Sequence, residues 1–160
     1  MMFWECGVPI QYKSSSLEKL LLPNLAASLL ALDLDNTEDT TGVYLFGPTG
    51  GGKTRAVYLF AHQLIQTKGW SVRFLRGGQF QREIVNRTRP GGTDDLDAWL
   101  HEISETELLI IDEVEKIRFS PRVESEFFEL LEDRLSNWKP LILISNATVK
   151  GLCPAVRGFC

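Results

Sequence analysis

The chain has 160 residues, of which 44% are hydrophobic and 24% charged. This length and composition predict one soluble globular domain with a sizeable core. The net charge of −4 excludes a protein coated in basic residues. Its three cysteines, Cys6, Cys153 and Cys160, form no C-x-x-C pair, so neither a zinc site nor a disulfide framework is expected. The N-terminus lacks the pattern of a signal peptide, and the longest uncharged apolar-rich stretch, residues 20–32, is too short to cross a membrane, so we expect a cytoplasmic protein.

The first predicted elements lead into a glycine-rich loop. Residues 14–33 are rich in leucine and predict two short helices divided at Pro23. The apolar run at residues 43–46 then predicts a buried parallel strand. It is followed by Gly-Pro-Thr-Gly-Gly-Gly-Lys-Thr at residues 47–54, which satisfies the pattern G-x-x-x-x-G-K-[ST]. Apolar residues recur at helical spacing after this loop until Gly69, a typical helix C-cap.

This loop carries the groups that bind a nucleoside triphosphate. Its backbone N–H groups can form a nest for phosphate oxygens at the start of a helix, where the helix dipole is positive. Lys53 can reach the β- and γ-phosphates, and the hydroxyl of Thr54 can bind Mg²⁺. A glycine-rich turn that matches by chance is the alternative, and the flanking strand and helix argue against it. The predicted nucleotide-binding residues are Gly47, Pro48, Thr49, Gly50, Gly51, Gly52, Lys53 and Thr54.

The next segment is rich in arginine. Residues 71–75 predict a strand, and residues 79–87 predict a helix that is broken at Pro90. Such a cluster is typical either of a nucleic-acid contact or of a solvated helix face that is paired with neighbouring acids, and the sequence leaves both open. The arginines are Arg73, Arg76, Arg82, Arg87 and Arg89, with Glu83 among them and Asp94, Asp95 and Asp97 directly after them.

A further strand ends in two acids. After a helix predicted over residues 94–103, the apolar run 108–111 ends in Asp112 and Glu113. Open α/β sheets bind their ligands at the carboxyl ends of parallel strands. There Asp112 can hold Mg²⁺ through its water shell, and Glu113 can polarise a water for attack on the γ-phosphate. A strand that runs into a solvated turn is the alternative for this pair.

The last predicted elements are a helix and a strand. Apolar residues at helical spacing between Val123 and Leu135 mark an amphipathic helix, and residues 141–144 predict a strand that ends in Ser145 and Asn146. The Asn146 amide can bond the γ-phosphate or orient the attacking water, and a simple turn is the alternative. The alternation of strands and helices predicts an α/β fold with a mostly parallel, three-layer sheet and right-handed crossovers.

Together these motifs resemble the AAA+ ATPases and, within them, the DnaC/IstB group of bacterial helicase loaders and transposition helper ATPases. The resemblance rests on GPTGGGKT, LLIIDE and LILISN in this order, and on Gly7-Val8-Pro9 with Tyr12, which is similar to the element before the ATPase core of that group. It implies a three-layer P-loop NTPase of the AAA+ (ASCE) type, with the sensor strand between the P-loop strand and the Asp112 strand and without the last strand and lid. It implies one domain over residues 1–160, with an adenine-side segment over 1–40 and a truncated or minimal P-loop core over 41–160.

The resemblance also implies roles for single residues. Lys53, Glu113 and Asn146 are the catalytic candidates, Asn146 being the sensor of the γ-phosphate, and Thr54 and Asp112 are the Mg²⁺ ligands. The arginine-rich segment is where such loaders contact single-stranded DNA, and its candidates here are Arg82, Arg87 and Arg89. The candidates for an arginine finger are Arg157 and Arg134, with a surface helix arginine as the alternative for Arg134.

The leading functional prediction is an ATPase of DNA replication that resembles the helicase loaders. It would bind ATP and Mg²⁺, assemble with copies of itself on single-stranded DNA and act with a replicative helicase. The alternatives are an IstB-like helper that acts with a transposase, a nucleotide-binding switch with little hydrolysis, and a small-molecule kinase. The adjacent Asp112 and Glu113 argue against the kinase, and the lack of an Asn-Lys-x-Asp motif argues against guanine specificity.

Overall fold

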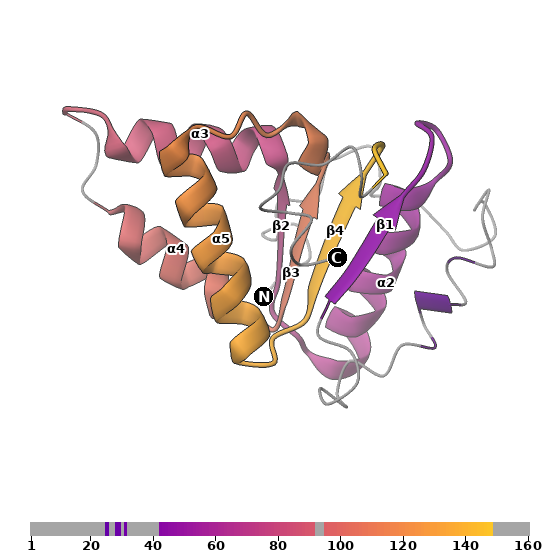
Figure 1. The fold of residues 1–160 in the computed structure, drawn as a ribbon. Coiled ribbons are helices and arrows are strands. Elements are labelled where there is room, and N and C mark those ends of the chain that lie inside the picture. Colours follow the sequence, from indigo (N-terminus) through magenta and orange to yellow (C-terminus); the bar gives the residue numbers. More distant parts are fainter. Residues whose placement is uncertain (1–24, 26–27, 30, 32–41, 92–94, 149–160) are drawn as a thin grey trace.

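A parallel sheet forms the centre of the computed structural model, which describes residues 25, 28–29, 31, 42–91 and 95–148 (Figure 1). Within these ranges, every strand runs parallel to its neighbours in the spatial order β1-β4-β3-β2. This order confirms the predicted α/β fold and places the sensor strand β4 between the P-loop strand β1 and the Asp112 strand β3. The strands are β1 (Gly42–Phe46), β2 (Val72–Arg76), β3 (Leu108–Asp112) and β4 (Leu141–Ser145).

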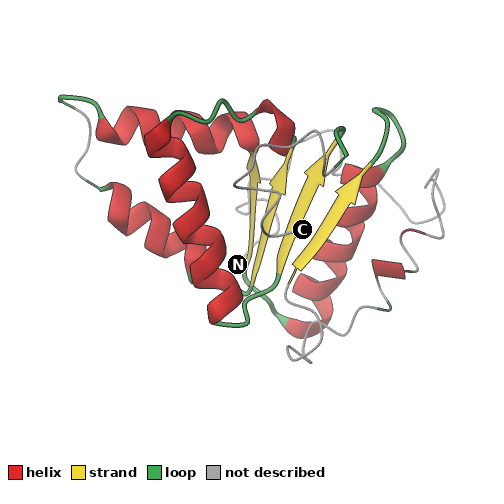
Figure 2. Cartoon of the chain, viewed as in Figure 1, coloured by secondary structure: helices red, strands yellow, loops and turns green. Residues whose placement is uncertain are grey.

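Helices cover both faces of this sheet and complete the predicted three layers (Figure 2). Helix α2 (Lys53–Lys68) packs on one face. The other face is covered by α3 (Gly77–Thr88), α4 (Leu96–Ser104) and α5 (Pro121–Ser136), and a short 3-10 helix, η4 (Val114–Lys116), follows β3. None of the helices in the described ranges is long and apolar enough to span a membrane.

Local sequence signals set the helix ends. Helix α2 ends where Gly69 adopts a left-handed conformation, with φ of 68°, and donates its N–H to Ile65 O at 3.1 Å. This confirms the predicted C-cap. Helix α5 begins after Ser120, whose hydroxyl accepts a hydrogen bond from Val123 N, and has Pro121 in its first turn.

The two faces of the sheet bury separate clusters. Leu109 and Ile111 face α3, α4 and α5, whereas Leu108 and Ile110 face α2. Strands β3 and β4 are covered on both faces, which explains their uninterrupted aliphatic runs. Strand β1 is only partly buried, and Phe46 at its end is 54% exposed. The prediction that this strand is buried is therefore wrong, because β1 lies at an edge of the described sheet and pairs there with β4.

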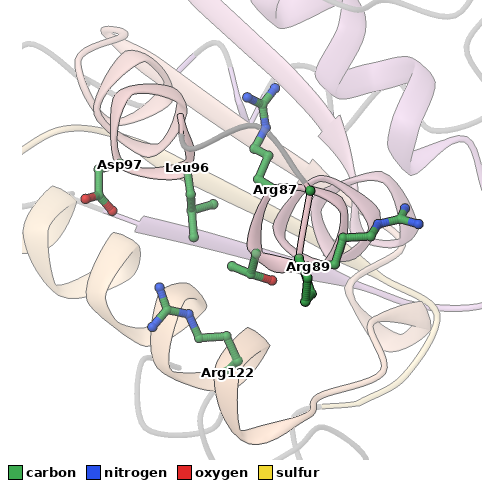
Figure 3. A pocket seen from close by; sticks show the side chains of 8 residues that line it. Arg87, Arg89, Leu96, Asp97 and Arg122 are labelled. Carbon is green, nitrogen blue, oxygen red and sulfur yellow. The ribbon is translucent and has the colours of Figure 1, made fainter.

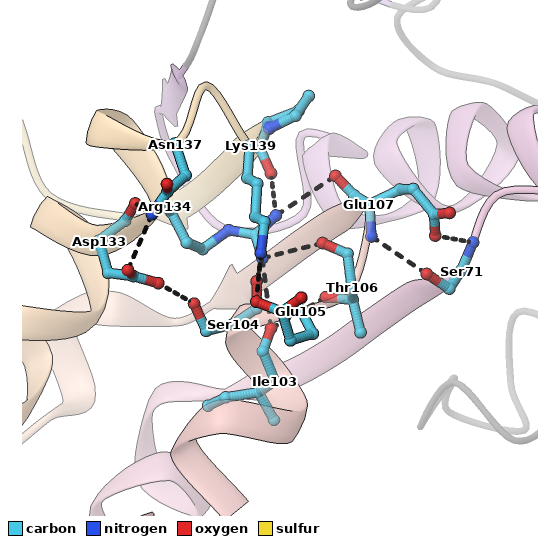
Figure 4. A network of polar contacts seen from close by, with 11 residues as sticks. Ser71, Ile103, Ser104, Glu105, Thr106, Glu107, Asp133, Arg134, Asn137 and Lys139 are labelled. Carbon is cyan, nitrogen blue, oxygen red and sulfur yellow. Dashed lines mark hydrogen bonds and ion pairs between the residues drawn. The ribbon is translucent and has the colours of Figure 1, made fainter.

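Arg134 on α5 departs furthest from the sequence-based expectation (Figure 4). Its side chain is 0% exposed, so both the surface position and the contact with a neighbouring subunit are wrong. Burial lowers the pKa of Arg134 to about 10, which still leaves it charged at neutral pH. The guanidinium joins the α4–β3 connection to the start of β4 by donating to five backbone carbonyls, those of Ile103, Ser104, Thr106, Glu107 and Pro140, over 2.7 to 3.3 Å.

Candidate functional site

Polar residues lie at the carboxyl ends of three parallel strands, which meet at the same end of the sheet. Strand β1 runs into the glycine-rich loop, β3 ends at Asp112, and Asn146 follows β4. Two hydrogen bonds connect these segments: Thr54 Oγ1 donates to Asp112 Oδ2 at 2.9 Å, and Lys53 Nζ donates to Asn146 Oδ1 at 3.1 Å. The structure thus brings together four of the predicted site residues from three separate parts of the chain.

The glycine-rich loop needs glycine at particular positions. Gly50 and Gly52 each have φ of 82°, in the left-handed region that side chains other than hydrogen rarely tolerate. Gly52 lies immediately before α2, so its conformation turns the loop into the first turn of the helix. The N-terminus of α2, with its unpaired N–H groups and positive dipole end, therefore follows the loop directly, as an anion site requires.

Lys53 is the first residue of α2, and its ammonium group lies over the loop. The side chain is buried, and Nζ donates to Gly47 O at 2.8 Å, to Pro48 O at 3.0 Å and to Asn146 Oδ1. An ammonium group has three donors, so all three are used in these bonds. A phosphate that binds Lys53 must therefore replace one of these acceptors.

Asp112 and Thr54 offer oxygen atoms of the kind that Mg²⁺ binds. Burial raises the pKa of Asp112, although hydrogen bonds from Thr54 and from the Glu113 N–H act in the opposite direction. The negative charges of Glu113 and Glu115 raise it further. A hydroxyl beside a buried carboxylate fits Mg²⁺, which takes one or two protein oxygens together with water and phosphate oxygens.

Glu113 follows β3 in an uncommon backbone conformation. Its φ of 57° and ψ of 43° are left-handed, which turns the chain sharply from β3 into η4. Its carboxylate forms an ion pair with Lys116. Its carbonyl lies against the start of α3, where a Cβ added at Gly77 would be 2.7 Å from Glu113 O. Gly77 thus makes room for the turn that carries the predicted catalytic base.

Sequence reasoning missed the two charged residues of η4. Glu115 accepts hydrogen bonds from Ser145, the last residue of β4, and from Asn146, and Lys116 pairs with Glu113. The contacts of Glu115 with Ser145 and Asn146 have no periodic signal, whereas Glu113 and Lys116 are three residues apart, a spacing at which side chains meet on a helix. The one available hint was the position of Glu115, two residues after Glu113 in an acidic run at the end of a strand.

Some of the arginines of β2 and α3 are paired with acids. Arg73 lies 3.5 Å from a carboxylate oxygen of Glu102, and Arg87 forms ion pairs with Glu83, at 3.1 Å, and with Asp95. Hydrogen bonding to Asp95 raises the pKa of Arg87, against a smaller effect of desolvation. Both arginines are thus paired with neighbouring acids, and of the two only Arg87 lies on a helix.

Arg87 and Arg89 border an open cavity of about 830 Å³ at the end of α3 (Figure 3). Asp97 of α4 and Arg122 of α5 line it as well, so both signs of charge are present. Arg82 is exposed on α3. The assignment of Arg82, Arg87 and Arg89 to DNA binding stays a prediction.

Several predicted features lie outside the described residues. They are the element Gly7-Val8-Pro9 with Tyr12, the two helices over 14–33 apart from a few described positions, and Arg157. The division into an adenine-side segment and a P-loop core stays a prediction for the same reason.

Comparison with known proteins relates the chain to ATP-binding proteins. The model of the family described as IstB-like ATP binding protein matches residues 10–152. Among curated proteins, the chromosomal replication initiator protein DnaA of Paraburkholderia phymatum is 27% identical over 109 residues, which are 68% of this chain and 20% of that protein. The chain therefore spans about a fifth of the length of the curated relatives it matches.

Two solved structures share the fold. A structure of the replication initiator DnaA bound to AMPPCP and single-stranded DNA has a TM-score of 0.73 at 19% identity, covering 94% of this chain and 48% of that one. The DnaC helicase loader has a TM-score of 0.64 at 15% identity, covering 94% of this chain and 86% of that one. Because the family model spans residues 10–152, the chain belongs to the IstB-like ATP binding protein family, as an AAA+ ATP-binding domain related to replication initiators and helicase loaders.

Proposed function

We propose that this chain binds ATP with Mg²⁺ at its glycine-rich loop, hydrolyses the ATP, and acts in DNA replication as a helicase-loader-like ATPase. The observation that carries the proposal is the pair of hydrogen bonds that join the loop to β3 and β4, Thr54 to Asp112 and Lys53 to Asn146. They bring together a cation, a hydroxyl, a carboxylate and an amide, the groups that phosphoryl transfer from a nucleotide requires.

Each of these groups has a distinct task in the proposed mechanism. Lys53 binds the terminal phosphates after releasing one of its present acceptors, and Asn146 donates an N–H to the γ-phosphate. Thr54 and Asp112 would hold Mg²⁺, which when bound neutralises charge on the phosphates. Water attacks the γ-phosphorus as Glu113 accepts its proton, and the bond from phosphorus to the β,γ-bridging oxygen breaks to release ADP.

The ion pair between Glu113 and Lys116 supports the second candidate, a nucleotide-binding switch with little hydrolysis. The oxygen of Glu113 that pairs with Lys116 could otherwise accept a hydrogen bond from the attacking water. While the pair persists, this oxygen is not free to accept a hydrogen bond from the attacking water, so bound ATP turns over slowly. Slow hydrolysis in the absence of a partner is therefore part of the proposal.

The biological role is supported by the named relatives. The matched curated proteins are replication initiators, one structural neighbour is a helicase loader, and another is a DnaA bound to single-stranded DNA. We propose that this chain likewise assembles with copies of itself on single-stranded DNA and acts with a replicative helicase. The IstB-like family match equally supports an ATPase that assists a transposase.

The test of ATP binding compares Lys53→Ala with Lys68→Ala, a change of the same residue type at the far end of α2. Loss of a charged hydrogen bond to phosphate should weaken the binding of a fluorescent ATP analogue about 10- to 100-fold in Lys53→Ala. Lys68→Ala should bind as the wild type does. Equal affinity in all three proteins would reject the P-loop assignment.

Hydrolysis is tested by measuring the release of phosphate from ATP with and without single-stranded DNA. Stimulation by DNA supports the ATPase, whereas tight binding with no release under either condition supports the switch. ATP-dependent loading of a replicative helicase onto single-stranded DNA would then support the loader role. Stimulation of strand transfer by a transposase would support the transposition helper instead.

A further inference from the structure

Glu115 of η4 reaches across to the end of β4. Its Oε2 accepts hydrogen bonds from Ser145 Oγ at 2.8 Å and from the backbone N–H of Asn146 at 3.2 Å, and its Oε1 accepts one from Asn146 Nδ2 at 2.8 Å. Burial alone would raise the pKa of Glu115, but hydrogen bonds from Ser145, from its own backbone N–H and from Asn146 together lower it. The group is therefore an ionised carboxylate at neutral pH that accepts bonds from both residues.

These contacts decide how the Asn146 amide is oriented. The two ends of an amide have the same shape and are distinguished only by what they bond, since Oδ1 accepts and Nδ2 donates. The carboxylate of Glu115 can only accept hydrogen bonds, so it bonds the Nδ2 of Asn146. The ammonium of Lys53 can only donate them, so it bonds the Oδ1. Glu115 and Lys53 thus select the same one of the two orientations.

We propose that Glu115 is a positioning residue that holds the Asn146 amide in the orientation needed to recognise the γ-phosphate, and so lets the site distinguish ATP from ADP. This inference rests on the proposed function. Phosphate oxygens only accept hydrogen bonds, so Asn146 must present an N–H to them. The second N–H of Nδ2 serves this purpose while the first stays on Glu115.

Glu115→Gln tests the inference because it removes the charge but keeps the shape. Glutamine offers one acceptor and one donor to a place where the carboxylate accepts three hydrogen bonds. Once a phosphate has replaced Asn146 as an acceptor of the Lys53 ammonium, the conflict is relieved when the Asn146 amide turns over, which brings its Oδ1 toward the NH₂ group of the introduced glutamine. In that orientation the site disfavours a γ-phosphate and leaves the binding of ADP untouched.

The measurement is a pair of titrations of the full chain with Mg²⁺, one with fluorescently labelled ADP and one with a labelled non-hydrolysable ATP analogue. Glu115→Gln should lower the preference for the ATP analogue about tenfold at unchanged ADP affinity, the effect of one misplaced hydrogen bond to a charged group. Glu115→Ala, which removes the carboxylate without adding an amide, should lower the preference as well. Glu132→Gln, an exposed change of the same kind on α5, is the matched control and should behave as the wild type.

A double-mutant cycle with Asn146→Ala separates positioning from general stabilisation. If Glu115 acts through Asn146, Glu115→Gln changes nothing further in the Asn146→Ala background. An unchanged preference in both Glu115 variants, an equal loss of ADP and ATP binding, or additive effects in the cycle would each overturn the inference. A wild-type protein that binds neither nucleotide would reject the proposed function itself, a result distinct from any of these three.

Discussion

Replacing Arg134 by methionine should destabilise the fold strongly while leaving the surface unchanged. The guanidinium is fully buried and donates to five backbone carbonyls (Figure 4). Methionine fills much of the same volume but donates nothing. The substitution therefore isolates the hydrogen bonds of Arg134 from its packing.

The size of the effect follows from the acceptors. Pro140 O also accepts from Leu109 N, and Ile103 O also accepts from Thr106 Oγ1, so these two carbonyls keep a donor. We count the other three as losing a charged donor, at about 1–3 kcal/mol for each acceptor buried without a partner. Because two of those bonds are only partly buried, we expect the free energy of unfolding to fall by about 3–5 kcal/mol.

Urea denaturation followed by circular dichroism measures this loss, which corresponds to a fall in the melting temperature of about 6–20 °C. Arg134→Lys should be intermediate, because an ammonium has three donors for five acceptors. Arg122→Met is the control on the same helix: its side chain is 60% exposed and its ion pair with Glu126 should contribute about 1 kcal/mol at most. A loss below about 1 kcal/mol in Arg134→Met would refute the reasoning.

Three further predictions concern catalysis, DNA and pH. Glu113→Gln should bind ATP normally but lower turnover about 100-fold or more in a single-turnover assay, because an amide is no base; hydrolysis at the wild-type rate would remove Glu113 from the mechanism. Replacing Arg82, Arg87 and Arg89 together by alanine should lower the slope of log affinity against log salt for single-stranded DNA by about 0.7 for each phosphate that the protein no longer neutralises, and an unaltered slope would make the cluster a solvated face. Burial raises the pKa of Glu126 above 4.5, so the folded protein keeps a proton that the unfolded chain loses, and stability falls as pH rises through that window. Glu126→Gln should therefore raise the free energy of unfolding near neutral pH, and the gain should shrink under acid; a difference that does not vary with pH would contradict this.

The sequence by itself determined the elements of the fold and the P-loop. Strand runs and helical spacing predicted the order of strands and helices, and Gly69 was correctly predicted to end α2. These signals are local, since a cap, a period or a glycine at a left-handed position depends on neighbours along the chain. The resemblance to AAA+ ATPases added the position of β4 between β1 and β3, which the structure confirms.

Only the tertiary structure decided which charged groups meet. Arg134 occupies a position on α5 that the sequence does not distinguish from the surface, and it is buried because carbonyls 27 to 31 residues earlier converge on it. Glu115 bonds Asn146, 31 residues away, and Arg87 of α3 is paired with Asp95 of the segment before α4. Such pairs are set by how strands and helices are arranged in space, and a charged residue has the same local pattern whether it faces water or a partner. The physical reason is that burial and partner choice are properties of the assembled layers, whereas periodicity and capping are properties of the chain.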